Sequence, residues 1–214
     1  MNIEVIPTIL VKSFKEVKER IKKVEDCVSW VQLDVMDGIF VDNKTFNDPG
    51  KLKNLKTDIK LEAHLMIQKP EEVIDDWLRI VDRIIIHFES EIEGRELGIK
   101  KMIKKAHNKN REFGLAINPE TDVTAIKSFL KDIELILIMT VQPGWGGQKF
   151  QNWTLEKIKF LREIWPNGNI EVDGGLNDKT APKAIEAGAN IICAGNYIFK
   201  NKDIKEAIKN LKKI

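Results

Sequence analysis

The sequence predicts a (β/α)8 barrel, in which eight parallel strands close into a cylinder surrounded by helices. Short apolar, β-branched runs recur at intervals of roughly 20 to 30 residues, and segments of helical period lie between them. Several runs, such as LILIM at 135–139, are apolar throughout, as parallel strands buried on both faces are. Eight strand-helix units close most economically into a TIM barrel. An open, doubly wound sheet is the alternative, but the first strand-helix turn, PTILVKSF at 7–14, lacks the glycine fingerprint of a dinucleotide fold.

The eight expected strands are short and rich in isoleucine, valine and leucine. In chain order they are 3–10, 29–35, 59–66, 83–88, 113–118, 134–141, 170–174 and 190–195. The helices between them carry start signals, because one follows a Ser13-x-x-Glu16 capping box and another follows Pro70 at a first-turn position. Their apolar faces consist of Phe14, Val17, Ile21 and Val24 in the first and of Val73, Trp77 and Val81 in the second. The amphipathic segment 200–214 is expected to pack as a helix on its own protein instead of a membrane.

Composition favours one domain over residues 1–214, because no Pro-, Ser- or Gly-rich linker divides the chain. Lys and Arg number 35 against 33 Asp and Glu, which gives a net charge of +2. Lysines alternate with acidic residues along the helices, as on a solvated surface, and this argues against a nucleic-acid partner. The chain shows no signal peptide and no stretch of membrane-spanning length, so we expect a cytoplasmic protein. Cys27 and Cys193, at unrelated spacing, are interpreted as reduced thiols in or near the core.

Polar residues occur at the carboxyl ends of most of the expected strands, where the active sites of barrels lie. Alternation with period two places Gln32, Asp34 and Met36 on the inner face of the second strand. Asp37 is out of phase and precedes a glycine, which favours a loop role. The residues at the strand ends, which are polar except for Met139 and Gly195, are Thr8, Gln32, Asp34, His64, His87, Asn118, Met139, Asp173 and Gly195.

Asp34, His64 and Asp173 are expected to converge from three strands at the mouth of the barrel. Their types suit either a metal site or paired acid-base catalysis. The alternative is that each carboxylate only caps a helix or holds a loop. Glycine-rich turns follow the last three strands as PGWGGQ, DGG and AGN, and freed backbone amides there predict a phosphorylated substrate.

With these motifs in hand, the chain resembles the ribulose-phosphate 3-epimerase family from end to end. The resemblance runs through IPTIL, LDVMDGIFVDNKTF, HLMIQKP, GLAINPETDV, MTVQPGWGGQKF, EVDGG and EAGANIICAGNYIF. It implies a barrel of the ribulose-phosphate binding type that interconverts D-ribulose 5-phosphate and D-xylulose 5-phosphate in the pentose phosphate pathway. It also implies one divalent metal ion, which could be zinc, iron, manganese or magnesium. We further expect a homo-oligomer.

The resemblance assigns roles by position. It implies that Asp34 and Asp173 are the acid-base pair and that both bind the metal together with His64. The expected substrate-binding residues are Thr8, Met36, His64, Met66, Met139, Gly144, Trp145, Gly146, Gly147, Gly174, Gly175, Gly195 and Asn196.

Gln32 is the departure from the family that matters most, because it stands where the family has a metal-binding histidine. As a ligand through its amide oxygen, it would bind zinc or ferrous iron less tightly and would favour manganese or magnesium relatively more. Ile39 also replaces a histidine, while Thr8 and Asn196 each replace a serine.

Two alternatives stay open at this point, and a third is disfavoured. Asp42, Asn47 and Trp145 could select another ketose phosphate, such as allulose 6-phosphate. The second alternative is a sugar-phosphate-binding protein without catalysis, although such a protein would not require both aspartates. The related barrel decarboxylases are disfavoured, because their D-x-K-x-x-D signature would need lysine at Met36 and aspartate at Ile39.

Overall fold

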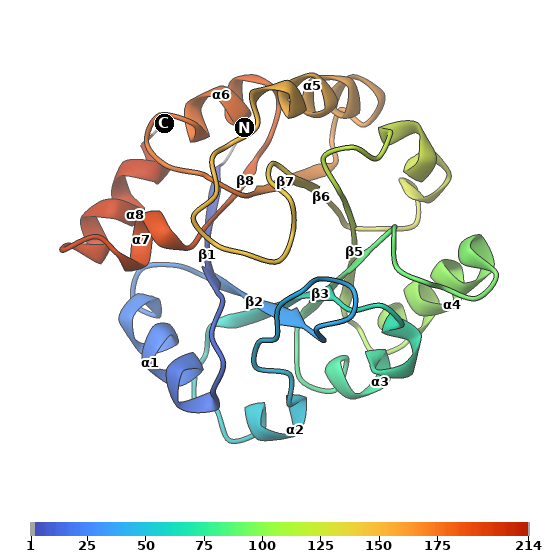
Figure 1. Cartoon of the computed structure of the whole chain (residues 1–214), viewed down its shortest axis with the longest axis horizontal. Coiled ribbons are helices and arrows are strands. Elements are labelled where there is room, and N and C mark those ends of the chain that lie inside the picture. Colours follow the sequence, from blue (N-terminus) through green and yellow to red (C-terminus); the bar gives the residue numbers. More distant parts are fainter. Residues whose placement is uncertain (1–2, 214) are drawn as a thin grey trace.

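The computed structural model describes residues 3–213 and has the predicted (β/α)8 architecture. Each strand pairs in parallel with the next along the chain, and β8 pairs with β1 to close the barrel. Figure 1 looks down this barrel, with the helices arranged around it. The strands are β1 (Glu4–Ile9), β2 (Trp30–Met36), β3 (Lys60–Met66), β4 (Arg83–His87), β5 (Glu112–Ile117), β6 (Leu135–Met139), β7 (Asn169–Asp173) and β8 (Ile191–Ala194).

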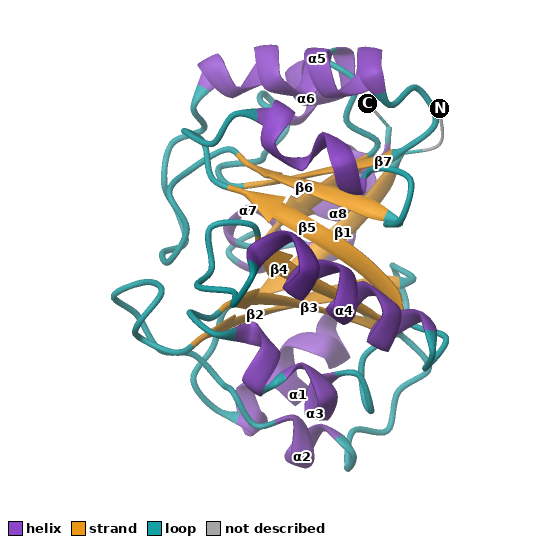
Figure 2. Ribbon diagram, turned by 90° about the vertical axis from the view of Figure 1, so that its right-hand side faces the viewer, coloured by secondary structure: helices purple, strands orange, loops and turns teal. Residues whose placement is uncertain are grey.

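The α-helices lie between the strands on the outside of the barrel, as the side view in Figure 2 shows. They are α1 (Phe14–Val24), α2 (Pro49–Leu52), α3 (Ile74–Trp77), α4 (Arg95–His107), α5 (Leu155–Ile164), α6 (Ala181–Glu186), α7 (Asn196–Phe199) and α8 (Ile204–Lys212). The 3-10 helices η1, η2 and η3 span Pro70–Glu72, Val123–Phe129 and Asn152–Thr154.

Strand β2 shows how the alternation of side chains builds two cores. All seven of its residues are buried. Val31, Leu33 and Val35 pack in the large apolar layer between the barrel and the helices. Gln32 and Asp34 have the opposite parity and face into the barrel, as expected. The fold therefore holds a polar set of side chains inside an otherwise apolar cylinder.

The first and the last α-helix, α1 and α8, form as the sequence patterns predict. The N–H of Glu16 donates to Ser13 Oγ over 3.3 Å at the start of α1. In α8, Ala207, Ile208 and Leu211 are buried and the helix packs beside α1 and β1, so the prediction that this segment covers its own protein is confirmed. Within residues 3–213, no helix is both long enough and apolar enough to cross a membrane.

The connection between β5 and β6 differs from the strand-helix repeat, because η2 stands in place of an α-helix. Its buried residues Val123, Ile126 and Phe129 follow one another at intervals of three. A 3-10 helix has three residues per turn, so this spacing puts all three on one face against the barrel. The spacing, rather than helix propensity, explains the local geometry.

Two long loops meet over the mouth of the barrel, where Figure 1 shows the loop after β2 in blue and the loop after β6 in gold. The side-chain amide of Asn43, in the first loop, donates to the carbonyl oxygen of Gly144 in the second over 2.7 Å. This contact joins loops that lie about a hundred positions apart in the chain and places both beside the strand ends.

Candidate active site

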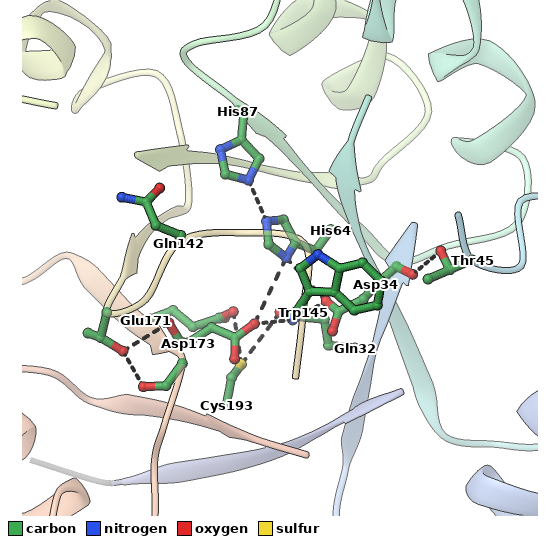
Figure 3. Close-up of polar contacts among 12 residues, drawn as sticks. Gln32, Asp34, Thr45, His64, His87, Gln142, Trp145, Glu171, Asp173 and Cys193 are labelled. Carbon is green, nitrogen blue, oxygen red and sulfur yellow. Dashed lines mark hydrogen bonds and ion pairs between the residues drawn. The ribbon is translucent and has the colours of Figure 1, made fainter. Parts of the chain in front are cut away.

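Three side chains that could bind a metal meet at the carboxyl ends of β2, β3 and β7 (Figure 3). Asp34 and His64 are partners in the β2–β3 register, and Asp173 is the last residue of β7. His64 Nδ1 lies 3.2 Å from Asp34 Oδ1 and 4.0 Å from Asp173 Oδ2. One ligand atom from each residue lies within 4.8 Å of the others. The expected convergence is therefore present, and within residues 3–213 neither carboxylate caps a helix.

Burial makes Asp173 a weaker acid than an exposed aspartate. Desolvation raises the pKa of Asp173 to about 7, and repulsion from the nearby Asp34 carboxylate adds to the increase. The hydrogen bond from Gln32 and the attraction of His64 oppose it. A carboxyl group whose pKa lies close to the working pH can both give and take a proton, so this shift is the one expected of an acid-base catalyst.

Gln32 lies fully buried between the two aspartates. Its Nε2 donates to Asp34 Oδ1 over 2.8 Å and to Asp173 Oδ2 over 3.0 Å. Its Oε1 accepts from the thiol of Cys193 over 3.5 Å. The side chain thus turns its amino group, not its carbonyl oxygen, toward the carboxylates.

A row of hydrogen bonds lies behind His64, and the sequence pattern predicts none of it beyond the place of His87 at a strand end. His64 Nε2 lies 2.8 Å from His87 Nε2, and His87 Nδ1 lies 3.2 Å from Glu89 Oε2. The other oxygen of Glu89 accepts from the backbone N–H of Asn118 over 2.8 Å and from the hydroxyl of Thr121. The signal that could have revealed the row is the His87-x-Glu89 pair at the end of β4.

When the imidazoles of His64 and His87 are both neutral, they carry too few protons to donate to both Asp34 and Glu89. Burial lowers the pKa of His87 to about 4, so this ring is neutral at neutral pH. Two neutral rings carry two N–H groups, and one is used between His64 and His87. The remaining N–H group can then donate to Asp34 or to Glu89, but not to both. A cation beside Asp34 would remove this conflict, because His64 Nδ1 could then offer its lone pair.

The residues expected to bind substrate, apart from His64, line one pocket above this site. Asp34 and Asp173 also line it, whereas His64 and Gln32 are fully buried beneath. Met36, Met66 and Met139 form an apolar part of the wall. Among the described lining residues, Arg20 is the only one that carries a positive charge.

Glycine is required in the loop after β7 because of its backbone geometry. Gly174 and Gly175 have φ angles of 122° and 70°. A Cβ atom at Gly175 would lie 2.5 Å from the backbone nitrogen of Phe150 in the loop after β6. The loops after β6 and β7 can therefore approach each other only with glycine at this position.

A second polar cluster lies deeper in the barrel than the candidate metal ligands, and its Glu62 and Glu171 stand two residues before His64 and Asp173 on β3 and β7. The guanidinium group of Arg83 lies 2.6 Å from Glu62 and 3.9 Å from Glu171, and its Cζ lies 4.2 Å from the centre of the Trp30 ring. The Cys193 thiol donates to Glu171 over 3.0 Å. Burial and the neighbouring Glu62 hold the pKa of Glu171 well above its usual range. Gln32 connects this cluster to the aspartates above it.

Asp37 has the loop role that its sequence position suggested. One of its carboxylate oxygens accepts from the backbone N–H groups of Ile39 and Phe40, over 2.8 and 2.9 Å, and the other accepts from Gln68 N–H over 2.8 Å. These bonds fix the start of the loop after β2. Ile39 itself is 70% exposed and does not line the pocket. Cys27 and Cys193 are both free thiols.

Comparison with known sequences identifies similar proteins over almost the whole chain. The model of the ribulose-phosphate 3 epimerase family matches residues 4–199. The chain is 38% identical to the chloroplastic ribulose-5-phosphate-3-epimerase of Arabidopsis thaliana, with 99% of this chain and 76% of that protein covered. It is 36% identical to the ribulose-phosphate 3-epimerases of Schizosaccharomyces pombe and Bacillus subtilis, with 99% and 98% of this chain covered and 93% and 98% of theirs.

Comparison with solved structures supports the fold. The 3-hexulose-6-phosphate synthase of Salmonella typhimurium superposes with a TM-score of 0.74 over 99% of this chain and 97% of its own, at 13% identity. The orotidine 5'-monophosphate decarboxylase of Sulfolobus solfataricus gives a TM-score of 0.66 over 99% and 96%, at 12% identity. At such identities the likeness concerns the barrel alone.

Proposed function

The chain belongs to the ribulose-phosphate 3-epimerase family, and from this we propose that it interconverts D-ribulose 5-phosphate and D-xylulose 5-phosphate. The observation that carries the proposal is the pair of carboxylates, Asp34 on β2 and Asp173 on β7, at the base of a pocket lined by glycine-rich loops. A protein that only bound the sugar phosphate would not need two carboxylates held in this way.

The reaction moves one proton at the third carbon of the substrate. The C–H bond next to the ketone breaks, one carboxylate takes the proton, and the electron pair forms an enediolate. The other aspartate is protonated at that stage, and its carboxyl group donates its proton to the opposite face of the same carbon. Asp34 and Asp173 serve in these two roles because they reach the pocket from different strands, and the raised pKa of Asp173 suits proton exchange near neutral pH.

The residues present fit a divalent metal ion as cofactor. Asp34, His64 and Asp173 offer two carboxylate oxygens and one imidazole nitrogen close to one another. A cation held there supplies Lewis-acid stabilisation of the negative charge that develops on the substrate oxygens when the proton leaves. Two hard oxygen ligands and a single nitrogen are compatible with manganese or magnesium as well as with zinc.

The phosphate group of the substrate binds at the loops after β6, β7 and β8. Gly146, Gly175 and Gly195 line the pocket, and backbone N–H groups in glycine-rich turns of this kind bind anions without a charged side chain. Arg20, whose guanidinium Cζ lies 4.5 Å from the centre of the Phe199 ring, adds one positive charge at the rim. Thr8 and the methionines contact the remainder of the sugar chain.

Incubation in heavy water tests the function directly. With ribulose 5-phosphate and one of Mn²⁺, Mg²⁺, Zn²⁺ or Fe²⁺ at a time, NMR should show deuterium at the third carbon and the appearance of xylulose 5-phosphate. Unphosphorylated ribulose is the matched control and should react far more slowly. Exchange with allulose 6-phosphate but not with ribulose 5-phosphate would identify a different substrate, and no exchange with any of the metals would refute an epimerase.

Glu89→Gln is expected to weaken metal binding by about 10- to 100-fold, although Glu89 is not a ligand. The oxygen of a glutamine at this position must serve the backbone N–H of Asn118 and the hydroxyl of Thr121, so its amino group faces His87 Nδ1. His87 then donates through Nε2, and His64 must carry its proton on Nδ1, where it can no longer bind a cation.

Calorimetric titration of Mn²⁺ into EDTA-treated protein measures this effect, and ¹⁵N NMR of the histidines reports the change of tautomer. Glu91→Gln is the matched control, because it makes the same chemical change two residues away at an exposed position. Equal Mn²⁺ affinity in Glu89→Gln and the wild type would show that the row of hydrogen bonds does not set the tautomer of His64.

A further inference from the structure

The amide of Gln32 lies between the two carboxylates that the proposed function assigns to the metal. Its amino group contacts Oδ1 of Asp34 and Oδ2 of Asp173, over 2.8 and 3.0 Å. These same two oxygens are the ones closest to His64 Nδ1, at 3.2 and 4.0 Å. Figure 3 shows the three side chains meeting at this point. One set of oxygen atoms therefore serves both the amide and any bound metal.

The surroundings of Gln32 fix the direction of the amide. In the observed orientation each N–H group has a carboxylate acceptor, and the carbonyl oxygen lies 3.5 Å from the sulfur of Cys193, whose one proton is shared with Glu171. The reverse orientation would turn the carbonyl oxygen toward the two carboxylate oxygens, so Asp34 and Asp173 would each lose the hydrogen bond that Gln32 donates. Because Gln32 is fully buried, water cannot compensate for such a loss.

We propose that Gln32 is a hydrogen-bond bridge that holds Asp34 and Asp173 together in the metal-free protein, and that a divalent cation must displace this bridge in order to bind. Gln32 thus sets the metal affinity by competition and not by donating a ligand oxygen. The inference rests on the metal site of the proposed function, and it concerns binding of the ion rather than turnover.

The contacts of Gln32 explain why the bridge is an effective competitor. Both of its N–H groups bind carboxylates, and hydrogen bonds to charged acceptors are the stronger kind. In the metal-free state the bridge also relieves the repulsion between two aspartates that share one buried site. Removal of the amino group should therefore destabilise the metal-free state and leave the metal-bound state unchanged.

Gln32→Met is the variant that separates the possibilities. Methionine has a similar length, contributes no donor, and its thioether is a poor ligand for the hard ion Mn²⁺. Cys193 keeps Glu171 as an acceptor at 3.0 Å, so the substitution leaves no thiol proton unpaired. We expect Mn²⁺ to bind Gln32→Met about tenfold more tightly than the wild type, as measured by calorimetric titration of EDTA-treated protein.

The other results of this titration would overturn the inference. Weaker binding of Mn²⁺ in Gln32→Met would mean that the amide oxygen is a ligand, and equal binding would mean that the amide and the ion do not compete. Gln142→Met is the matched control, because Gln142 donates to Glu120 and not to the aspartates, and its Mn²⁺ affinity should match the wild type.

A measurement on the wild type decides the matter if Gln32→Met does not fold. The side-chain NH2 signals of Gln32 should be protected from hydrogen exchange in the metal-free protein and should lose this protection when Mg²⁺ or Zn²⁺ is added. Protection that persists at saturating metal would contradict the displacement. Failure of the proposed function would be recognised separately, as an absence of epimerisation in protein that binds metal normally.

Discussion

Asp173→Asn and Asp34→Asn should each lower kcat for epimerisation by about 100- to 10,000-fold, the range typical of a lost acid-base group. An asparagine keeps the size of the side chain but can neither take the proton from the third carbon nor return one to it. In both variants Gln32 keeps an oxygen to which it can donate, so the fold around the site should persist. Steady-state kinetics at saturating metal measures the effect.

Isotope exchange gives these two variants a sharper test than the loss of rate. If each carboxylate serves one epimer, a variant that retains only one carboxylate should wash deuterium into one of the two pentulose phosphates and not into the other. The two variants should show opposite preferences. Asp178→Asn, an exposed position five residues after Asp173, is the control and should exchange both epimers. Equal exchange of both epimers in Asp173→Asn would assign the chemistry to another group.

The sequence was sufficient to predict the barrel and the convergence of Asp34, His64 and Asp173, because both follow from strand periodicity. Alternation placed Asp34 inside the barrel, and the common direction of parallel strands placed the three residues at the same end. The residues expected to contact substrate line one pocket, with the exception of His64, which is buried beneath it. Their catalytic and binding roles remain proposals.

The contacts that the sequence did not reveal depend on the register between strands. Periodicity says that a side chain points inward, but not which neighbour it meets. His87 meets His64 because β4 lies beside β3, and the amide of Gln32 reaches Asp173 across the barrel from β2 to β7. The direction of the Gln32 amide depends on Cys193 from β8, which no local pattern connects to β2. These contacts required the closed barrel.

Arg83→Met should destabilise the fold by about 3–5 kcal/mol, because it removes the cation from a buried ion pair and leaves its partners without compensation. Arg83 is 4% exposed, and it lies 2.6 Å from Glu62 Oε2 and 3.9 Å from Glu171 Oε2. Burial already raises the pKa of both glutamates, and Arg83 is the positive charge that opposes the increase. Denaturation by urea, with the free energy of unfolding compared to the wild type, measures the loss. The sequence offered no direct sign of this cluster, although Arg83 shares its inward parity with His87.

The pH dependence of Arg83→Met distinguishes the loss of charge compensation from a loss of packing. A carboxyl group whose pKa is raised in the folded state binds more protons there than in the unfolded chain, so stability falls as the pH rises above the unfolded value near 4.5. The penalty of Arg83→Met should therefore be larger at pH 8 than at pH 5, and Glu62→Gln added to it should recover part of the loss. Arg79→Met removes an exposed ion pair with Asp76 and should cost less than about 1 kcal/mol. A penalty for Arg83→Met that is as small as this, or one that does not change with pH, would mean that the two glutamates are stabilised without the guanidinium group.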